Sequence, residues 1–278
     1  MRMNGLPENT TFLFRMIWFV KKFFEGLTLA DFAVWVSMLL ILTAIFFLVP
    51  AEIRVLLQLN KDNFFVWQLF TAAFVHGNFE HLLDNVISFA FVFGLELAIV
   101  AKMPDLRIRF YKIFAITLLV VPLTTNTVDF LFSPSNTTLG FSAVSSAIYG
   151  LLFFVIICFI NKDLDKKIDY QKIYWALLVY LLLLLVITVF VSPLVAAITV
   201  NLAAVAILTK KYNLKPRKIW NYFKQDPYRI QFLTLAAVLI LGLSVMFQLQ
   251  FAEGYSVNYK AHCLGACIGI ILPVIIEK

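Results

Sequence analysis

A serine and a histidine far apart in the chain have the residue types and the surroundings for covalent catalysis. Ser142 follows Gly140 by two residues at the start of an apolar stretch, and His262 precedes Gly265 and Gly269 in the last apolar stretch. An imidazole can take the proton of a serine hydroxyl, and a backbone N–H at a helix start has no partner inside the helix and can donate to an oxyanion. Because no carboxylate has a spacing that ties it to His262, we predict a Ser–His dyad rather than a triad.

Further donors for a developing oxyanion stand in the run from His76 to Asn85. His81 and Asn85 are four residues apart, so on a helix their side chains project from one face. With the Ser142 backbone N–H they form the predicted oxyanion hole. A polar helix end facing lipid headgroups and a metal site are the alternatives for these histidines. No third ligand stands at the spacing of a zinc protease motif, so we predict no metal.

The elements that must position these residues are apolar helices. Hydrophobic residues make up 62% of the 278 residues and charged residues 14%, and the mean hydropathy is +0.90, which excludes an ordinary soluble domain and a disordered chain. Eight stretches have about the 20 apolar residues that a spanning helix needs. They cover roughly residues 28–50, 79–101, 110–132, 141–160, 172–191, 193–210, 230–250 and 258–276. We therefore expect an all-α, polytopic membrane protein of about eight spans.

The Lys and Arg residues give the spans a direction. With the N-terminus inside and eight crossings, 20 of the 23 basic residues fall in cytoplasmic segments, and only Arg54, Lys61 and Lys260 lie outside. This asymmetry predicts an N-in, C-in topology, with residues 1–27 as a cytoplasmic or interfacial segment and the aromatic residues 51–78 as an outer loop in the membrane interface. The net charge of +7 then reflects topology, and we expect no nucleic-acid partner.

The predicted topology brings the reactive side chains to one depth. It rests on Lys and Arg alone, yet it places His81, Asn85, Ser142 and His262 at the same outer level of the membrane, on three helices. Ionisable or strongly polar side chains inside spans are costly and mark functional sites. Each motif alone is explained by helix packing or by a polar helix end, but their coincidence in depth and chemistry favours one active site.

The order and spacing of these motifs resemble the rhomboid intramembrane serine proteases. The pattern is His-x4-His-x3-Asn, then Gly-x-Ser opening a later helix, then Ala-His before spaced glycines, and it runs from about Trp67 to Leu272. The resemblance implies a six-helix core, no cofactor, a Ser142–His262 dyad, and an oxyanion hole from His81, Asn85 and the Ser142 backbone. It gives His76 a supporting role, and we expect Gly140, Ala143, Gly265 and Gly269 to support the site as well.

The sequence departs from the family pattern at several points. Ala143 follows the nucleophile where rhomboids usually carry glycine, and Ser146 stands where many members have an aromatic residue. The Trp-Arg pair of the first loop is absent, and Glu96 is not at the common spacing from Gly94. Three apolar stretches, rather than one, separate the serine helix from the histidine helix. We therefore expect residues 28–278 to form a rhomboid-like transmembrane domain with two additional helices, an extra hairpin somewhere within 161–250.

The resulting functional hypothesis is an intramembrane serine endopeptidase that cuts peptide bonds in or near transmembrane helices and opens to the outer face. Its expected partners are transmembrane-protein substrates and the lipid bilayer, and its expected place is the cell membrane. Ala143 and Ser146 favour an alternative, a rhomboid-like protein that binds transmembrane helices without cleaving them. A transporter with a histidine-lined polar site is the third hypothesis. Neither the physiological substrate nor the oligomeric state follows from the sequence.

Overall fold

The computed structural model describes residues 21, 24–163 and 259–276, which are mostly helical. The elements are α2 (Leu29–Leu48), α3 (Ala51–Leu57), β1 (Leu59–Asn60), α4 (Gln68–Thr71), the 3-10 helix η1 (Ala72–Phe74), α5 (Phe79–Val100), α6 (Pro104–Phe132), β2 (Thr137–Thr138), α7 (Ser142–Asp163) and α12 (Tyr259–Ile276). Within these residues α2, α5 and α6 are long and apolar enough to cross a membrane, and α7 and α12 contain shorter apolar stretches.

Four of the predicted spans coincide with helices to within three residues: 28–50, 79–101, 141–160 and 258–276. The helix that corresponds to the span predicted over 110–132 begins earlier, at Pro104. Proline is favoured at the first helical position because the N–H it lacks would have no helical partner there, and Asp105 in the first turn complements the helix dipole. The spans predicted at 172–191, 193–210 and 230–250 lie outside the described residues, as does most of segment 1–27.

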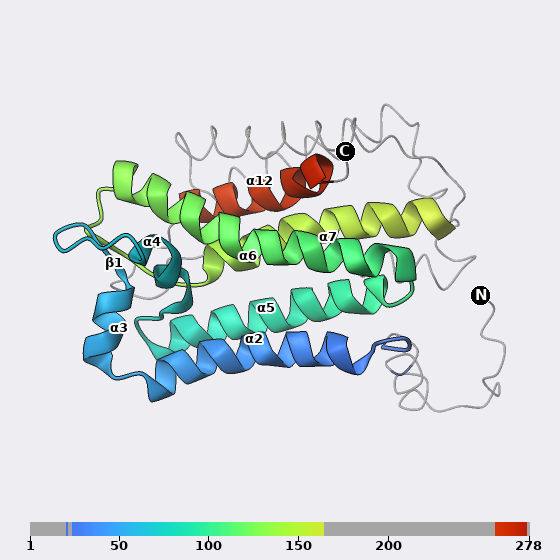
Figure 1. Cartoon of the computed structure of the whole chain (residues 1–278), viewed down its shortest axis with the longest axis horizontal. Helices are drawn as coiled ribbons and strands as arrows, with labels where there is room; N and C mark the ends of the chain where they lie inside the picture. Colours follow the sequence, from blue (N-terminus) through green and yellow to red (C-terminus); the bar gives the residue numbers. More distant parts are fainter. Residues whose placement is uncertain (1–20, 22–23, 164–258, 277–278) are drawn as a thin grey trace, which may run out of the picture. The chain divides into compact units, whose positions relative to one another are not determined.

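The described helices belong almost entirely to one compact unit, Phe23–Leu178 with Asn258–Lys278. In this unit α12 lies along α7, α5 contacts both α7 and α2, and α6 contacts α7 and α12 (Figure 1). Phenylalanine rings in mutual contact fill the space between α5, α6 and the start of α7. The Phe93 ring centre is 4.3 Å from that of Phe114, and the Phe89 ring centre is 5.5 Å from that of Phe141. This aromatic packing fixes the residue before Ser142 against α5.

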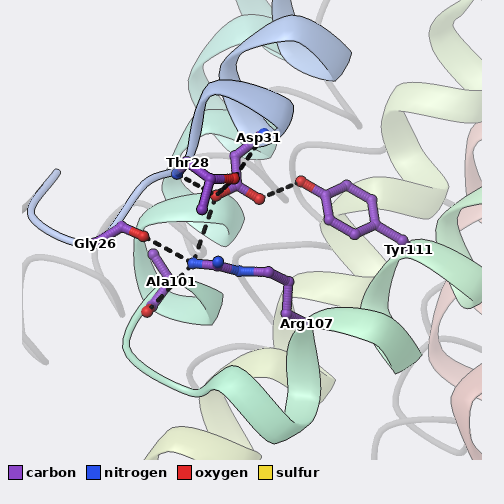
Figure 2. Close-up of polar contacts among 6 residues, drawn as sticks. All are labelled: Gly26, Thr28, Asp31, Ala101, Arg107 and Tyr111. Carbon is purple, nitrogen blue, oxygen red and sulfur yellow. Dashed lines mark hydrogen bonds and ion pairs between the residues drawn. The ribbon is translucent and has the colours of Figure 1, made fainter.

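At the end where α2 and α6 begin, a buried polar cluster joins α2 to the turn between α5 and α6 (Figure 2). The Arg107 guanidinium donates to the Gly26 carbonyl at 2.8 Å and lies 3.5 Å from the Asp31 carboxylate. The Tyr111 hydroxyl donates to the same carboxylate, which also caps α2 through Thr28. Since Asp31 is 1% exposed, these partners are what make its burial tolerable.

We call the opposite end, where α5, α7 and α12 begin, the Ser142 end. Here the segment predicted as an outer loop, 51–78, contains α3, β1, α4 and η1. The exposed side chains Phe64, Phe65 and Trp67 match the aromatic composition on which the interfacial prediction rests. Strand β1 pairs antiparallel with β2, with Leu59 opposite Thr138 and Asn60 opposite Thr137. The first loop is thereby joined to the segment that leads into Ser142.

Candidate active site

The turn before Ser142 has a backbone conformation that favours glycine at position 140. Gly140 has φ of +117°, a left-handed conformation that other residues rarely adopt, and its N–H donates to the Ala72 carbonyl at 2.9 Å. Helix α7 then begins at Ser142, and the Phe141 carbonyl accepts its first helical bond from the Ser145 N–H at 3.0 Å. The N–H of Ser142 therefore has no acceptor inside α7, and its side chain is half-buried.

His81 lies against this turn. The Asn78 side chain caps α5 by accepting from the His81 N–H at 2.8 Å, which fixes His81 in the first turn. A Cβ atom built on Gly140 would lie 2.7 Å from His81 Nε2, so nothing larger than hydrogen fits between the ring and the turn. Asn85, one turn further along α5, donates to the His81 carbonyl at 2.8 Å. An amide carries two N–H donors, so this bond occupies one and leaves the second for another acceptor.

His76 supports the same turn from the other side. Its imidazole is 2% exposed, and its Nε2 accepts a long hydrogen bond of 3.5 Å from the Phe141 N–H. The His76 and His81 ring centres are 5.1 Å apart, edge to face. Burial, helped by the charge that His81 can carry, lowers the pKa of His76 from 6.5 to about 3, and the Phe74 carbonyl opposes this only in part. His76 is therefore neutral at physiological pH, as an acceptor nitrogen requires.

Helices α7 and α12 touch backbone to backbone. A Cβ atom on Gly265 would overlap the Ala143 carbonyl, and one on Gly269 would overlap the Ala147 carbonyl. Gly150 on α7 likewise fits only because it has no side chain facing the Ala266 carbonyl. Small residues allow such close approach between helices in membranes. Because both glycine contacts step by four residues in the same direction, the two helices run parallel and both begin at the Ser142 end.

This register brings Ser142 and His262 to one level. Ser142 precedes the contact residue Ala143 by one position, and His262 precedes Gly265 by three. At 1.5 Å per residue, the two backbones differ in height by only about 3 Å. His262, Gly265 and Gly269 are spaced i, i+3 and i+7, so the imidazole, which is 9% exposed, lies on the helix face turned toward α7.

The residues that follow Ser142 are buried. Ser146 donates to the Ser142 carbonyl at 2.8 Å, a bond within α7 that uses its hydroxyl. The Ser145 hydroxyl is buried without a hydrogen bond in the described part of the chain. Deeper on α5, Glu96 is fully buried, and within the same described residues neither of its carboxyl oxygens is hydrogen-bonded. Among residues 24–163 and 259–276, no group of three or more His, Cys, Asp or Glu side chains could hold a metal ion.

The sequence reasoning missed the contacts that hold the first loop to the Ser142 turn. Lys61 donates from Nζ to the Ser133 carbonyl and from its backbone N–H to the Asn136 carbonyl. Gln68, 1% exposed, accepts from the Phe65 N–H at 3.2 Å and donates to the Leu56 carbonyl at 3.2 Å. The sequence offered one signal for this role, because Gln68 is a polar amide among the aromatic residues Trp67 and Phe70. The Gln68 bonds stabilise the first loop itself, and the Lys61 bonds join that loop to the segment that leads into Ser142.

Comparison with protein-family models finds a match to the Rhomboid domain over residues 63–208. This stretch covers more than half of the 278 residues and includes α5, α6 and α7, and it ends before His262. No curated protein and no solved structure matched the chain significantly. The family match, together with several apolar helices of membrane-spanning length, makes this an integral membrane protein. The chain belongs to the rhomboid family.

Proposed function

We propose that this protein is an intramembrane serine endopeptidase whose Ser142–His262 dyad hydrolyses peptide bonds in or near transmembrane helices. The observation that carries the proposal is the parallel, backbone-to-backbone packing of α12 on α7 through Gly265 and Gly269. It supports an approach of His262 to the level of Ser142, although the family match itself ends before α12.

The chemistry needs a proton acceptor at Ser142 and a proton donor for the leaving group. Ser142 Oγ attacks the peptide carbonyl carbon while His262 takes the hydroxyl proton, and a tetrahedral oxyanion forms. His262 then returns this proton to the leaving nitrogen as the peptide C–N bond breaks. Water attacks the remaining ester, again giving its proton to His262, which passes it to Ser142 Oγ as the acid product departs. The entry of water at a helix end, rather than through the hydrocarbon, makes the last step possible.

The oxyanion donors are the Ser142 N–H, His81 and the second side-chain N–H of Asn85. The Ser142 N–H has no helical acceptor, and the position of His81 against Gly140 keeps its ring beside the nucleophile's turn. Removing one such donor typically lowers kcat by about 100- to 1000-fold. Since Asn85 already donates to the His81 carbonyl, its loss costs the least of the three.

The same proposal extends to topology and partners. We assign an N-in, C-in arrangement in the cell membrane, with the Ser142 end extracytoplasmic, and transmembrane proteins as substrates. It includes a rhomboid-like domain over residues 28–278 with two additional helices within 161–250. The asymmetric distribution of Lys and Arg supports this orientation. Rhomboid membership supports substrates that lie in the bilayer.

The deciding experiment compares wild type, Ser142→Ala and His262→Ala in cleavage of one model transmembrane substrate and in labelling by a fluorophosphonate. Wild type is expected to cleave and to be labelled, and both variants to lose cleavage. Labelling that persists in Ser142→Ala overturns the assignment of the nucleophile. A folded wild type that binds the helix yet neither cleaves it nor reacts supports a non-catalytic member of the family instead.

A further inference from the structure

An exposed carboxylate, Asp84, lies at the border between the candidate active site and the exposed apolar side of α5. Asp84 is the sixth residue of this helix and its side chain is exposed. In the described part of the chain no Lys or Arg forms an ion pair with it, and its charge acts on the His81 imidazole. Charged side chains within membrane helices are costly and usually have a partner of opposite charge. We therefore expect a cationic partner for Asp84.

The position of Asp84 around α5 follows from helix geometry. Residues 81, 84 and 87 are three apart, and each such step turns the direction of the side chain by about 60°. The series runs from His81, which lies against the Gly140 turn, through Asp84 to Ile87, which is 57% exposed. Asp84 therefore stands on the path that leads from the exposed face of α5 to the candidate oxyanion group.

The exposed face itself is suited to an apolar helix. Four large side chains follow one another at intervals of four residues, each at least 41% exposed: Phe79, Leu83, Ile87 and Phe91. Glu80, on the first turn of the same helix, is also exposed, so the apolar stripe ends in two carboxylates at the Ser142 end. A transmembrane helix that packs along this stripe brings its own flanking residues beside Asp84 and Glu80.

We propose that Asp84 selects transmembrane substrates that carry a Lys or Arg at the flank facing the Ser142 end. This rests on the proposed function and deepens it by naming the substrate class. A cation gains from an unpaired carboxylate most where water is scarce, and the long apolar stems of Lys and Arg let their charges reach a helix end from within the bilayer. The same carboxylate repels an acidic flank, so it attracts substrates with a basic flank and disfavours substrates with an acidic one. In the proposed topology, where the Ser142 end is extracytoplasmic, few membrane helices carry basic residues on that flank, which makes the preference selective.

The test uses the full-length protein in neutral detergent micelles and three model substrates that differ only in one flanking residue, Lys, Gln or Glu. The readout is the ratio of kcat/KM for the Lys and Glu substrates, because any effect of Asp84 on His81 cancels in that ratio. Wild type is expected to favour Lys by about tenfold. Asp84→Asn brings the ratio close to one, and Asp84→Lys reverses it. Glu52→Lys, the same charge change at an exposed residue of α3, keeps the wild-type ratio.

Binding of the same three helices to Ser142→Ala separates this inference from the proposed function. A flat ratio in wild type, or a preference unchanged in Asp84→Asn, overturns the role of Asp84. If wild type cleaves none of the substrates but binding still favours Lys and reverses in Asp84→Lys combined with Ser142→Ala, the proposed protease activity falls and the role of Asp84 stands. If neither binding nor cleavage depends on the flank, the inference is wrong whatever the activity. Neutral detergent removes lipid ammonium groups as competing partners.

Discussion

The His81 imidazole and the Gly140 backbone are in direct contact. A Cβ atom on Gly140 would lie 2.5 Å from His81 Cε1 and 2.7 Å from its Nε2, closer than non-bonded atoms approach. Gly140 also has a φ of +117°, which side chains disfavour. The absence of a Cβ atom at Gly140 therefore permits two things: the turn that leads into Ser142, and the position of His81, the side chain assigned to the oxyanion.

Gly140→Ala is expected to displace His81 and to strain the turn, lowering kcat by at least about 100-fold and stability by about 1–3 kcal/mol. Cleavage assays and thermal unfolding in detergent measure the two effects. The matched control is Gly26→Ala, because Gly26 also has a positive φ, +99°, but lies at the other end of the helices. It should lose stability and keep kcat, and equal losses of kcat in both variants would contradict the role of the His81 contact.

Gly269→Val tests the register of α12. The new side chain overlaps the Ala147 carbonyl, so α12 must move away from α7 although the substitution lies two turns from His262. Cleavage is expected to fall by more than about 100-fold because small displacements of catalytic groups cost this much. Ile275→Ala, on an exposed position of the same helix, should leave cleavage unchanged. Near-normal cleavage by Gly269→Val would show that the close contact does not position the site.

The low pKa of His76 predicts that the folded protein loses stability in acid. Its pKa is about 3 in the folded protein against 6.5 as an unperturbed side chain, so between these values the unfolded chain binds a proton that the folded chain does not. Stability is therefore complete above pH 6.5 and falls as the pH drops toward 3, by up to about 1.4 kcal/mol per pH unit. In thermal unfolding at several pH values, His76→Gln should be less stable at pH 7 but lose less on acidification. An unchanged pH dependence would rule out His76 as the cause.

The positions of the described helices α2, α5, α7 and α12 could be predicted from apolar length, because a spanning helix must satisfy its own backbone. The early start of α6 could not, since Arg107 and Arg109 make its first turns polar although Pro104 opens the helix well. Part of the candidate site could likewise be predicted from the sequence, and part could not. His81 and Asn85 share one face of the helix because they are four residues apart, and this could be predicted. The bond from Asn85 to the His81 carbonyl and the Lys61 contact with Ser133 depend on packing that no local sequence pattern indicates.

Glu96 is a buried carboxyl group that is expected to cost stability. It is 0% exposed, and in the described part of the chain neither oxygen has a hydrogen-bond partner. Replacing an unpartnered buried polar group by an apolar one of similar size removes its desolvation cost, so Glu96→Leu should gain about 1–3 kcal/mol and leave kcat unchanged. Thermal unfolding checks this beside Leu97→Ala, a neighbouring buried position expected to lose about 2–4 kcal/mol. A loss of stability in Glu96→Leu would refute the account.

The close fit of α12 on α7 also has a meaning for the order in which the protein is made. Chains are synthesised from the N-terminus, so Ser142 enters the membrane long before His262, with residues 164–258 between the two helices. A nascent chain that ends after α7 carries the proposed nucleophile without its proposed base, and a serine hydroxyl without a base is a weak nucleophile. Insertion of the last helix is then the event that switches on the proposed protease. Under the proposed mechanism, membrane proteins beside the unfinished chain are not cleaved before α12 is in place.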